Sequence, residues 1–338
     1  MILVLNCGSQ SIKWKIFNEK LKLVKQGKRD VFIAEEFEII LTEELNKITE
    51  KITIVGHRVV HGGGIFTKPL EVTTENLQEL EKISHLAPLH NPYNLLGIKA
   101  CQKAFADIPQ IAVFDTEFFA NLPEKAYTYA LPENIAKEFG FKRYGFHGIS
   151  HEYVAKKVKA MPIGRQAKKI ISVHLGGGAS ITAIKNGKAV DTSMGFTPME
   201  GLVMMTRAGN IDAGIVLELV KQFGIEGADK ILNKESGIKG ICGESDMLKV
   251  LEKIKAGDAN AKLAFDIFVY SIQKYIGSYF AILGGCDVLV FTGSIGSGNP
   301  RTRNAVCKGL DIFKNTKILV IETDEELAIA EKIKNIKI

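Results

Sequence analysis

Long apolar runs, paired cysteines and clustered charge are all scarce in this sequence. Its aliphatic stretches, such as Met1–Leu5 and Val288–Phe291, are far shorter than the roughly 20 residues that span a bilayer. Met1–Leu5 also lacks the basic leader and long apolar segment of a secretory signal peptide. The five cysteines form no Cys-x-x-Cys motif, which argues against a zinc finger or a disulfide framework. We therefore expect a cytoplasmic protein with reduced thiols.

The charged residues are not gathered in one place either. The 44 Lys and Arg residues against 38 Asp and Glu residues give a net charge of +6. The densest basic segment, residues 22–29, is followed at once by acidic residues, so a basic stripe for nucleic acid is not expected. A basic cleft for a smaller anionic substrate stays open.

Length and composition indicate a globular protein of two domains. The chain has 338 residues, against about 150 for one domain, and 46% hydrophobic with 24% charged residues is ordinary for folded chains. A strand, a glycine–serine turn and a second strand are predicted at Ile2–Phe17, and the same pattern returns at Ile170–Ile184. The two superimpose at an offset of half the chain (Val4 on Val173), which predicts a duplicated α/β domain.

Strands and helices are expected to alternate along the rest of the chain. Aliphatic runs between turn or charged residues predict strands at Ile52–Val55, Gln110–Phe114, Val288–Phe291 and Lys317–Ile321. Helical spacing of apolar residues predicts helices at Thr74–Ser84, Asn94–Ala104, Ser150–Lys159, Asp212–Phe223, Ala259–Leu283, Arg301–Leu310 and Glu325–Lys334. Asp324 is expected to cap the last helix.

Three glycine-rich turns follow predicted strands, at residues 8–11, 176–178 and 293–298. Glycine lets backbone N–H groups approach a phosphate, and serine hydroxyls add donors. One such turn is usually an ordinary tight turn, but three in one chain favour a polyphosphate held between two domains. Phosphoryl transfer also needs cations and oxygen ligands for magnesium. The sequence offers Arg58, Arg207, Lys13, Asn6, Asp115 and a C-terminal acid.

Several familiar motifs are absent, and the histidines stand out instead. No Gly-Lys-Ser/Thr follows a glycine-rich loop, so a P-loop is excluded. Histidines fall in three short strings with Gly, Pro, Arg or Asn, at Gly56–Gly63, Ala87–Pro92 and Tyr144–Gly148. A single histidine is most often a hydrogen-bonded structural residue. Three strings with fixed backbone shapes point to a site.

The strings resemble those of the acetate kinases, in the acetate and sugar kinase, Hsp70 and actin superfamily. Matching segments cover nearly the whole chain in order: Asn6–Lys13, Gly56–Gly63, Leu86–Pro92, Val113–Thr116, Arg143–Ser150, His174–Ser180, Thr192–Gly201, Thr206–Asp212 and Thr323–Ala330. The resemblance implies an α/β fold of two duplicated ribonuclease-H-like (actin-like ATPase) domains with an interdomain cleft. It implies a first domain of residues 1–118 plus 326–338, and a second of 119–325 that carries the nucleotide side and a homodimer interface.

The resemblance also implies the reaction. It is the reversible, Mg²⁺-dependent transfer of a phosphoryl group from ATP to acetate, in line, giving acetyl phosphate and ADP. Mn²⁺ is the alternative metal. A relative that uses pyrophosphate, or that prefers propionate or butyrate, is the alternative function. Acetate and ATP are the expected partners, with no nucleic acid, no membrane, and a second copy of the chain. An ATP-driven binding module would lack Arg58, Arg207 and His147, which are present.

Catalytic and acceptor roles follow from the resemblance residue by residue. Arg58 and Arg207 would clamp the carboxylate and the phosphoryl group, and His147 would donate to the transition state. Because an attacking carboxylate needs no general base, Asp115 is expected to orient Arg58 or the attacking group rather than to move a proton. The metal would be held by Asn6 and Glu325, with Glu326 as the alternative. The methyl group would lie among Val60, Leu89, Phe146 and Pro198, with His90 beside them.

The implied nucleotide side departs from the family pattern. The expected contacts are Lys13, His174, Leu175, Gly176, Gly177, Gly178, Asp246, Met247, Leu248, Ser294, Ile295, Gly296, Ser297 and Gly298. Gly177 stands where the family has asparagine, and Leu248 where it has arginine. The segment Ser294–Gly298 also differs from the family's turn. We therefore expect weaker nucleotide binding and a relaxed choice of base.

Overall fold

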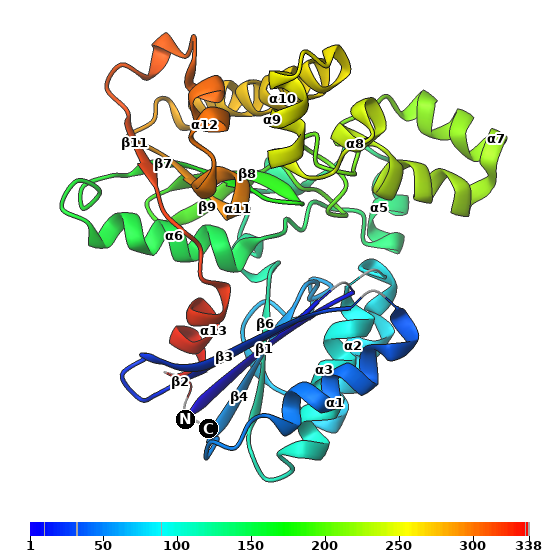
Figure 1. Cartoon of the computed structure of the whole chain (residues 1–338), viewed down its shortest axis with the longest axis vertical. Helices are drawn as coiled ribbons and strands as arrows, with labels where there is room; N and C mark the ends of the chain where they lie inside the picture. The colour runs from blue at the N-terminus through cyan, green and yellow to red at the C-terminus, as the bar shows by residue number, and fades with distance from the viewer. Residues whose placement is uncertain (10, 32, 89, 335, 337–338) are drawn as a thin grey trace. The chain divides into compact units, whose positions relative to one another are not determined.

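The computed structural model describes residues 1–9, 11–31, 33–88, 90–334 and 336, without the side chains of residues 34 and 311. Contacts divide the chain into two units, each with its own sheet (Figure 1). Unit 1 comprises Met1–Ala120, Phe146–Tyr153 and Asp324–Ile338, and unit 2 comprises Asn121–Gly145 and Val154–Thr323. Across the described residues, no helix is both long and apolar enough to cross a membrane.

Unit 1 is built on a six-stranded mixed sheet in the order β3-β2-β1-β4-β6-β5. Its strands are β1 (Ile2–Gly8), β2 (Ser11–Phe17), β3 (Leu23–Asp30), β4 (Ile54–Val59), β5 (Leu70–Glu71) and β6 (Gln110–Phe114). β1 and β2 form the predicted hairpin, and β4 and β6 run parallel to β1. β4 begins after the predicted start at Ile52 and continues to Val59, which places Arg58 on the strand. The predicted turn at residues 8–11 includes residue 10, which lies outside the described residues.

Unit 2 repeats this topology. Its five-stranded sheet has the order β11-β10-β7-β8-β9. The strands are β7 (Lys169–Leu175), β8 (Ala179–Lys185), β9 (Lys188–Thr192), β10 (Val288–Thr292) and β11 (Lys317–Val320). β7 and β8 form an antiparallel hairpin, and β10 and β11 run parallel to β7. The run β3-β2-β1-β4-β6 therefore corresponds strand by strand to β9-β8-β7-β10-β11, which confirms the predicted duplication.

Helices supply the remaining regular structure. The α-helices are α1 (Phe37–Asn46), α2 (Thr74–Lys82), α3 (Asn91–Ala104), α4 (Glu124–Tyr127), α5 (Glu133–Phe139), α6 (Gly148–Ala160), α7 (Ala213–Lys230), α8 (Gly237–Cys242), α9 (Met247–Lys255), α10 (Ala259–Leu283), α11 (Gly293–Gly298), α12 (Pro300–Cys307) and α13 (Glu325–Ile333). Short 3₁₀-helices are η1 (Ala34–Glu36), η2 (Ser84–Leu86), η3 (Glu117–Phe119) and η5 (Asp311–Phe313), and η4 (Ile231–Glu235) is a π-helix. The predicted cap of the last helix is confirmed, because the Asp324 carboxylate accepts a hydrogen bond from the Leu327 N–H at 2.9 Å.

The two faces of the unit 1 sheet are covered by different helices (Figure 1). Side chains alternate between the faces along a strand. On β1, Leu3 and Leu5 pack in one core cluster with residues of α1 and α3. The other face carries Asn6, whose amide contacts α13. The same α13 fills the space beside Gly56, where a Cβ would lie 2.7 Å from side-chain atoms of Ile329 and Ile333.

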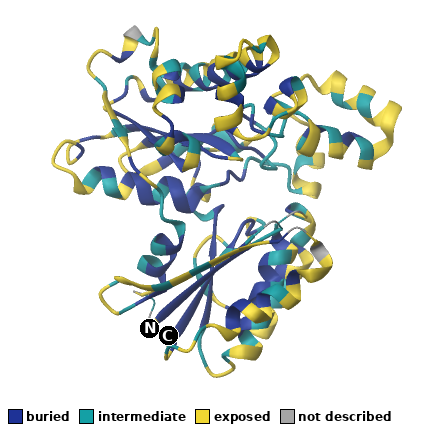
Figure 2. Ribbon diagram, in the orientation of Figure 1, coloured by how far each residue is buried: buried dark blue, intermediate teal, exposed yellow. Residues whose placement is uncertain are grey.

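Burial follows this layering within each unit, except at α7. The central strands are buried, whereas α7 is exposed along most of its length (Figure 2). Gly224 interrupts α7 with a φ of 71° and a ψ of 176°, so that the chain bends there. Because contact units and independently folding domains are different properties, the domain boundaries at residues 118, 119, 325 and 326 stay a prediction. The predicted first domain also includes residues 335, 337 and 338, which lie outside the described residues.

Candidate functional site

Charged and amide side chains gather at the carboxyl ends of three neighbouring strands in unit 1. Asn6 lies on β1, Arg58 lies near the end of β4, and Asp115 follows β6 directly. Because these strands are parallel neighbours, their carboxyl ends meet at one edge of the sheet, where α/β proteins bind ligands. α13 adds Glu325 at its first position. The structure thus brings together four residues that the sequence had marked separately.

Arg58 is at the centre of this cluster. Its Nε and Nη2 donate to Asp115 Oδ2 at 3.1 and 2.7 Å. Its Nη1 lies 3.1 Å from Glu325 Oε2 and donates to Asn6 Oδ1 at 3.4 Å. The side chain of Asp115 is 1% exposed and that of Arg58 is 18% exposed. A planar guanidinium that meets two carboxylates in a desolvated place has a fixed orientation.

The charges of this cluster oppose the effect of burial. Burial raises the pKa of Asp115, and the adjacent guanidinium of Arg58 works against that rise. Burial by itself would favour neutral Arg58, but the carboxylates of Asp115 and Glu325 outweigh it and raise the pKa of Arg58 above its ordinary value. Arg58 is therefore a permanent cation at the edge of the sheet.

Oxygen atoms at this edge make a donor set suited to a hard divalent cation. Asn6 donates through Nδ2 to Glu326 Oε1 at 3.2 Å, which leaves its Oδ1 as an acceptor. Asp115 Oδ1 is buried and has no hydrogen-bond partner among the described residues. Amide and carboxylate oxygens are the protein ligands that Mg²⁺ prefers. The residues present therefore fit magnesium.

The neighbouring acids of α13 differ in their partners. Lys15 Nζ lies 2.8 Å from Asp324 Oδ1 and 3.4 Å from Glu326 Oε2, so Glu326 contacts both Lys15 and Asn6. Within the described part of the chain, no three His, Cys, Asp or Glu residues are grouped to hold a metal ion.

His147 is placed beside Asp115 by an unusual backbone. Its φ is +58°, in the left-handed region that few non-glycine residues adopt. It lies just before α6, and the Gly148 N–H donates to the Asp115 carbonyl at 3.0 Å. A Cβ at Gly148 would lie 2.1 Å from that carbonyl oxygen, so only glycine allows this approach. A strained residue held by tight packing is typical of functional sites.

Two of the four predicted methyl-pocket residues lie in unit 1. Val60 and Phe146 are both buried. Val60 N–H donates to Asn94 Oδ1 at 3.0 Å, and the Phe146 ring lies edge-on to that of His61, with centroids 5.4 Å apart. Pro198 is in unit 2 and Leu89 lies outside the described residues. His90, the expected support, directly precedes α3.

In unit 2 the predicted phosphate turn joins β7 to β8. His174 and Leu175 end β7, and Gly176 N–H donates to Gly178 O at 2.9 Å, which closes the turn. A Cβ at Gly176 would lie 3.5 Å from Ser294 Oγ and 3.9 Å from His174 Nε2, so these two predicted contacts flank the turn. At Gly177 a Cβ would meet nothing within 4 Å, so an asparagine would fit there.

The predicted turn at residues 293–298 is instead a short helix, α11, so that prediction was wrong. Gly293 makes the bend from β10 with a φ of +78°, and a Cβ there would lie 2.4 Å from Leu175 O. Ser297 Oγ donates to Gly293 O at 2.8 Å, and Arg303 Nη1 donates to the Gly296 and Ser297 carbonyls at 2.9 and 2.7 Å. These side-chain bonds give partners to the carbonyls of Gly293, Gly296 and Ser297 in this short helix. Ile295 is carried on the same helix.

The predicted nucleoside segment forms the start of α9. Asp246 caps that helix, because its Oδ1 accepts from the Leu248 N–H at 2.8 Å. Met247 is buried, whereas Leu248 is 64% exposed. Lys13 lies on β2 directly opposite Asn6, so that the two side chains share a face of the unit 1 sheet.

Arg207 differs sharply from Arg58 in its surroundings. Its Nη1 donates to the Pro198 carbonyl at 3.1 Å, and burial lowers its pKa. Among the described residues no carboxylate lies within ion-pair distance of it. A half-buried cation without a counter-charge gains energy when an anion arrives. Arg207 is therefore ready to bind an anionic group.

Sequence reasoning gave no role to a partly buried polar network next to this arginine. Arg143 Nη2 lies 2.6 Å from Glu200 Oε1, and the Tyr129 hydroxyl donates to the other oxygen of Glu200. Burial raises the pKa of Tyr129, and the bond to Glu200 adds to that rise. Arg143 and Glu200 both lie inside segments used for the resemblance, but no motif links them, because their pairing depends on the fold.

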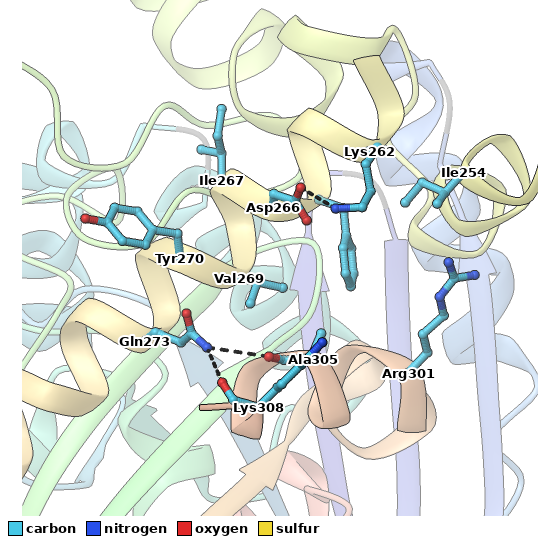
Figure 3. Close-up of a pocket in the computed structure, with 11 residues that line it drawn as sticks. Ile254, Lys262, Asp266, Ile267, Val269, Tyr270, Gln273, Arg301, Ala305 and Lys308 are labelled. Atoms are coloured by element: carbon cyan, nitrogen blue, oxygen red, sulfur yellow. Dashed lines mark hydrogen bonds and ion pairs between the residues drawn. The ribbon is translucent and has the colours of Figure 1, made fainter. Parts of the chain in front are cut away.

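A cavity of about 650 Å³ lies between α10, α12 and the end of α9 in unit 2 (Figure 3). None of the predicted site residues lines it. Lys262 pairs with Asp266 on the same helix, and Gln273 donates to the carbonyls of Ala305 and Lys308 at 3.5 and 3.1 Å (Figure 3). The Gln273 bonds hold α10 to α12, whereas the Lys262–Asp266 pair stays within α10.

Comparison with known proteins gives consistent matches. A model described as the acetokinase family matches residues 22–316. An acetate kinase from Helicobacter acinonychis is 43% identical over 99% of this chain and 98% of that protein. The crystal structure of Porphyromonas gingivalis acetate kinase superimposes with a TM-score of 0.89 at 36% identity, covering 99% of both chains. A propionate kinase from Francisella tularensis gives the same TM-score of 0.89 and 36% identity, covering 98% of both chains.

Proposed function

We propose that this chain, which belongs to the acetokinase family, is an acetate kinase. It moves a phosphoryl group from ATP to the carboxylate of acetate, in line and reversibly, giving acetyl phosphate and ADP. Beyond the full-length similarity, the observation that carries the proposal is Arg207, a half-buried guanidinium with no carboxylate within ion-pair distance among the described residues. Such a group suits a reaction in which both substrates are anions.

Arg207 and Arg58 have different tasks in this proposal. Arg207 lacks a competing carboxylate, so it meets the negative charge that develops on the transferred group. Arg58 is held by Asp115 and Glu325, so it presents a fixed cation to the acetate carboxylate. Asp115 accepts both of its hydrogen bonds from Arg58 on one oxygen, which supports the orienting role rather than proton transfer.

His147 serves as a hydrogen-bond donor to the transferred group. Its strained backbone and the close contact of Gly148 with Asp115 fix it relative to Arg58. Groups that are fixed before the reaction cost no reorganisation in the transition state.

We place Mg²⁺, with Mn²⁺ as the alternative, at the oxygens of Asn6 and Glu325. Glu326 is the alternative ligand: it contacts Lys15 and Asn6, whereas Glu325 contacts Arg58. When bound, the ion neutralises phosphate charge and orients the phosphates. Asp115 Oδ1, which is buried and without a hydrogen-bond partner among the described residues, would be an acceptor beside that ion.

ATP binding is assigned to both units. In unit 1, Lys13 meets the phosphates. In unit 2, the turn Gly176–Gly178 donates backbone N–H groups to them, and Asp246–Leu248 and Ser294–Gly298 lie against the nucleoside. The open space at Gly177 and the exposed Leu248 provide fewer side-chain contacts than asparagine and arginine would. Because the nucleotide side has fewer side-chain contacts, pyrophosphate is the alternative phosphoryl donor.

The acceptor pocket is assigned to Val60, Leu89, Phe146 and Pro198. Overall similarity does not fix the length of the acceptor, because the propionate kinase and the acetate kinase match equally well. One methylene typically discriminates by about 10–200-fold, so propionate should be a measurable but poorer substrate than acetate.

The protein is proposed to form a homodimer through α7. This helix exposes Ile215, Leu217, Phe223 and Ile225 by 50 to 75%, which is unusual for large apolar side chains in a free monomer. A helix that is apolar on several sides requires a partner. A second copy of this chain presents the same surface, which suits a twofold interface. We also propose cytoplasmic location, because ATP is the co-substrate, and the domain division at residues 118 and 325.

The deciding experiment is an acetyl phosphate assay with hydroxylamine trapping. Acetate, propionate and butyrate are each tested with ATP, GTP and pyrophosphate, with and without Mg²⁺. The proposal expects activity with ATP and acetate that depends on the divalent ion. A higher kcat/KM for butyrate, or a strong preference for pyrophosphate, would overturn the assignment of acceptor or donor respectively. Sedimentation of the parent and of Leu217→Glu tests the dimer.

A further inference from the structure

The segment that carries Pro198 and Arg207 has no regular structure of its own. Between the end of β9 at Thr192 and the start of α7 at Ala213, the chain forms only turns and bends. Loops longer than about 12–15 residues are uncommon in folded domains and are usually functional. A catalytic arginine on such a loop needs side chains from elsewhere to hold it.

Arg143, which precedes the loop in the sequence, is one of the side chains that hold it in place. Its Nη1 lies within 3.1–3.3 Å of three successive carbonyls, those of residues 192, 193 and 194. Its Nη2 lies 2.6 Å from Glu200 Oε1, and its Nε donates to Ala126 O at 3.2 Å. One guanidinium therefore joins both ends of the stretch that contains Pro198. A lysine could not make these contacts, because it has one nitrogen rather than a fork of three.

Tyr129 contacts the middle of the same stretch, at Phe196. The Tyr129 hydroxyl donates to Glu200 Oε2 and accepts from the Phe196 N–H at 2.9 Å. The Arg143 guanidinium lies over the Tyr129 ring, 5.6 Å from its centroid. A Cβ at Gly195 would lie 1.7 Å from Glu200 Oε2 and 2.1 Å from the Tyr129 hydroxyl. The backbone at Gly195 is thus pressed directly against the two side chains.

The stretch held by Arg143 and Tyr129, residues 192–200, contacts Arg207 directly. The Pro198 carbonyl, two residues before Glu200, accepts from Arg207 Nη1 at 3.1 Å. Beyond this bond and a 3.8 Å contact with Met204 Sδ, the guanidinium of Arg207 has no hydrogen-bond partner among the described residues. The position of the Pro198 carbonyl therefore decides where the guanidinium points.

We infer that Arg143, Glu200 and Tyr129 form a positioning assembly that aims Arg207 at the transferred phosphoryl group by fixing the Pro198 carbonyl. This inference rests on the proposed function, in which Arg207 is catalytic. The three residues touch no substrate; they act through Arg207 alone. Small misplacements of a catalytic group cost large factors in rate, so loss of the assembly lowers kcat while the nucleotide contacts of Gly176–Gly178 remain.

The test is a double-mutant cycle between Tyr129→Phe and Arg207→Ala. Tyr129→Phe removes only the hydroxyl that joins Glu200 to Phe196, and keeps the ring. In the parent we expect kcat to fall about 10-fold, with KM for ATP unchanged within about 2-fold, because one charge-assisted hydrogen bond is lost. In the Arg207→Ala background the same substitution should change kcat by less than about 2-fold, because its effect passes through the missing guanidinium.

Two further variants complete the design. Tyr270→Phe, at an exposed tyrosine on α10, is the matched control and should keep parental kcat. Arg143→Lys tests the fork itself and should lower kcat in the parent but not in the Arg207→Ala background. Melting temperatures of all variants identify any that fail to fold, and Tyr129→Phe keeps the test valid if Arg143→Lys does not fold.

The outcomes separate the inference from the proposed function. If Arg207→Ala turns over at nearly the parental rate, the proposed role of Arg207 fails and the inference fails with it. If Arg207→Ala is impaired but Tyr129→Phe lowers kcat by the same factor in both backgrounds, only the inference is overturned. A kcat for Tyr129→Phe equal to that of the parent also overturns it.

Discussion

Replacing Gly148 with alanine tests how closely the His147 turn packs on the strand end that carries Asp115. A Cβ at this position would lie 2.1 Å from Asp115 O, 3.0 Å from Phe118 Cβ and 3.2 Å from the Asp115 carbonyl carbon. Ordinary C···O contacts begin at about 3.3 Å, so the two backbone segments must separate by about 1 Å. Neither neighbour is a flexible side-chain end that could turn away.

The cost can be worked out from this displacement. Overpacking of this kind costs about 1–3 kcal/mol, and the better helix propensity of alanine at the start of α6 returns at most about 1 kcal/mol. Subtracting that full return leaves a net loss of about 0–2 kcal/mol, which corresponds to a fall of at most roughly 8 °C in melting temperature. Because His147 and Asp115 move apart by about 1 Å, we expect turnover to fall about 100-fold.

The assay pairs acetyl phosphate formation with thermal unfolding. Gly177→Ala is the matched control for stability, because its Cβ meets nothing within 4 Å and its φ is not in the left-handed region. That variant should melt within about 1 °C of the parent, since exposed substitutions rarely exceed about 0.5 kcal/mol. A Gly148→Ala variant with parental turnover and melting temperature would show that the close contact does not constrain the site.

Three further predictions concern charge, the donor and pH. Arg58→Ala and Arg207→Ala should each lower turnover roughly 100–1000-fold or more while the protein stays folded, and near-normal turnover would remove that residue from the mechanism. Gly177→Asn with Leu248→Arg should bind ATP more tightly by calorimetry and prefer it more sharply over GTP; unchanged ATP affinity would contradict the proposed donor side. Burial lowers the pKa of His57 from 6.5 to about 4, so its neutral form stabilises the fold above pH 6.5, and about 3 kcal/mol is lost as the pH falls from 6.5 through 4. His57→Gln should therefore flatten the decline in melting temperature over that range, and an unchanged decline would contradict the shift.

The local parts of the fold were predictable from sequence. β6 and α10 have the predicted bounds, because their ends are marked by turn or capping residues next to strongly apolar runs. α1 was missed, since no side chain caps its N-terminus and no start signal precedes it. α9 was missed because Asp246 was interpreted as a ligand motif, although it caps the helix. Capping and periodicity are short-range signals, and these elements show both their strength and their limit.

For the candidate site, too, one part could be predicted from the sequence and another part could not. Asn6, Arg58, Asp115 and Glu325 were named from separate strings, and the parallel strands bring them within contact of one another. Their assignment came through the resemblance, because nothing in the local sequence states that Asn6 and α13 meet. The network of Arg143, Glu200 and Tyr129 could not be found from sequence, since it depends on where three side chains from distant positions point. Residue roles across the site stay predictions until variants are measured.

The packing of α13 has a consequence for how the protein is made. Asn6 and Glu326 touch across 320 positions of sequence, so β1 is synthesised long before the helix that packs against it. Until then the face of β1 and β4 that bears Val4 and Gly56 has no Ile329 or Ile333 against it. Contacts so distant in sequence slow folding and leave apolar surface exposed during synthesis. The same helix carries Glu325, so Arg58 gains this ion-pair partner only after α13 has packed in unit 1.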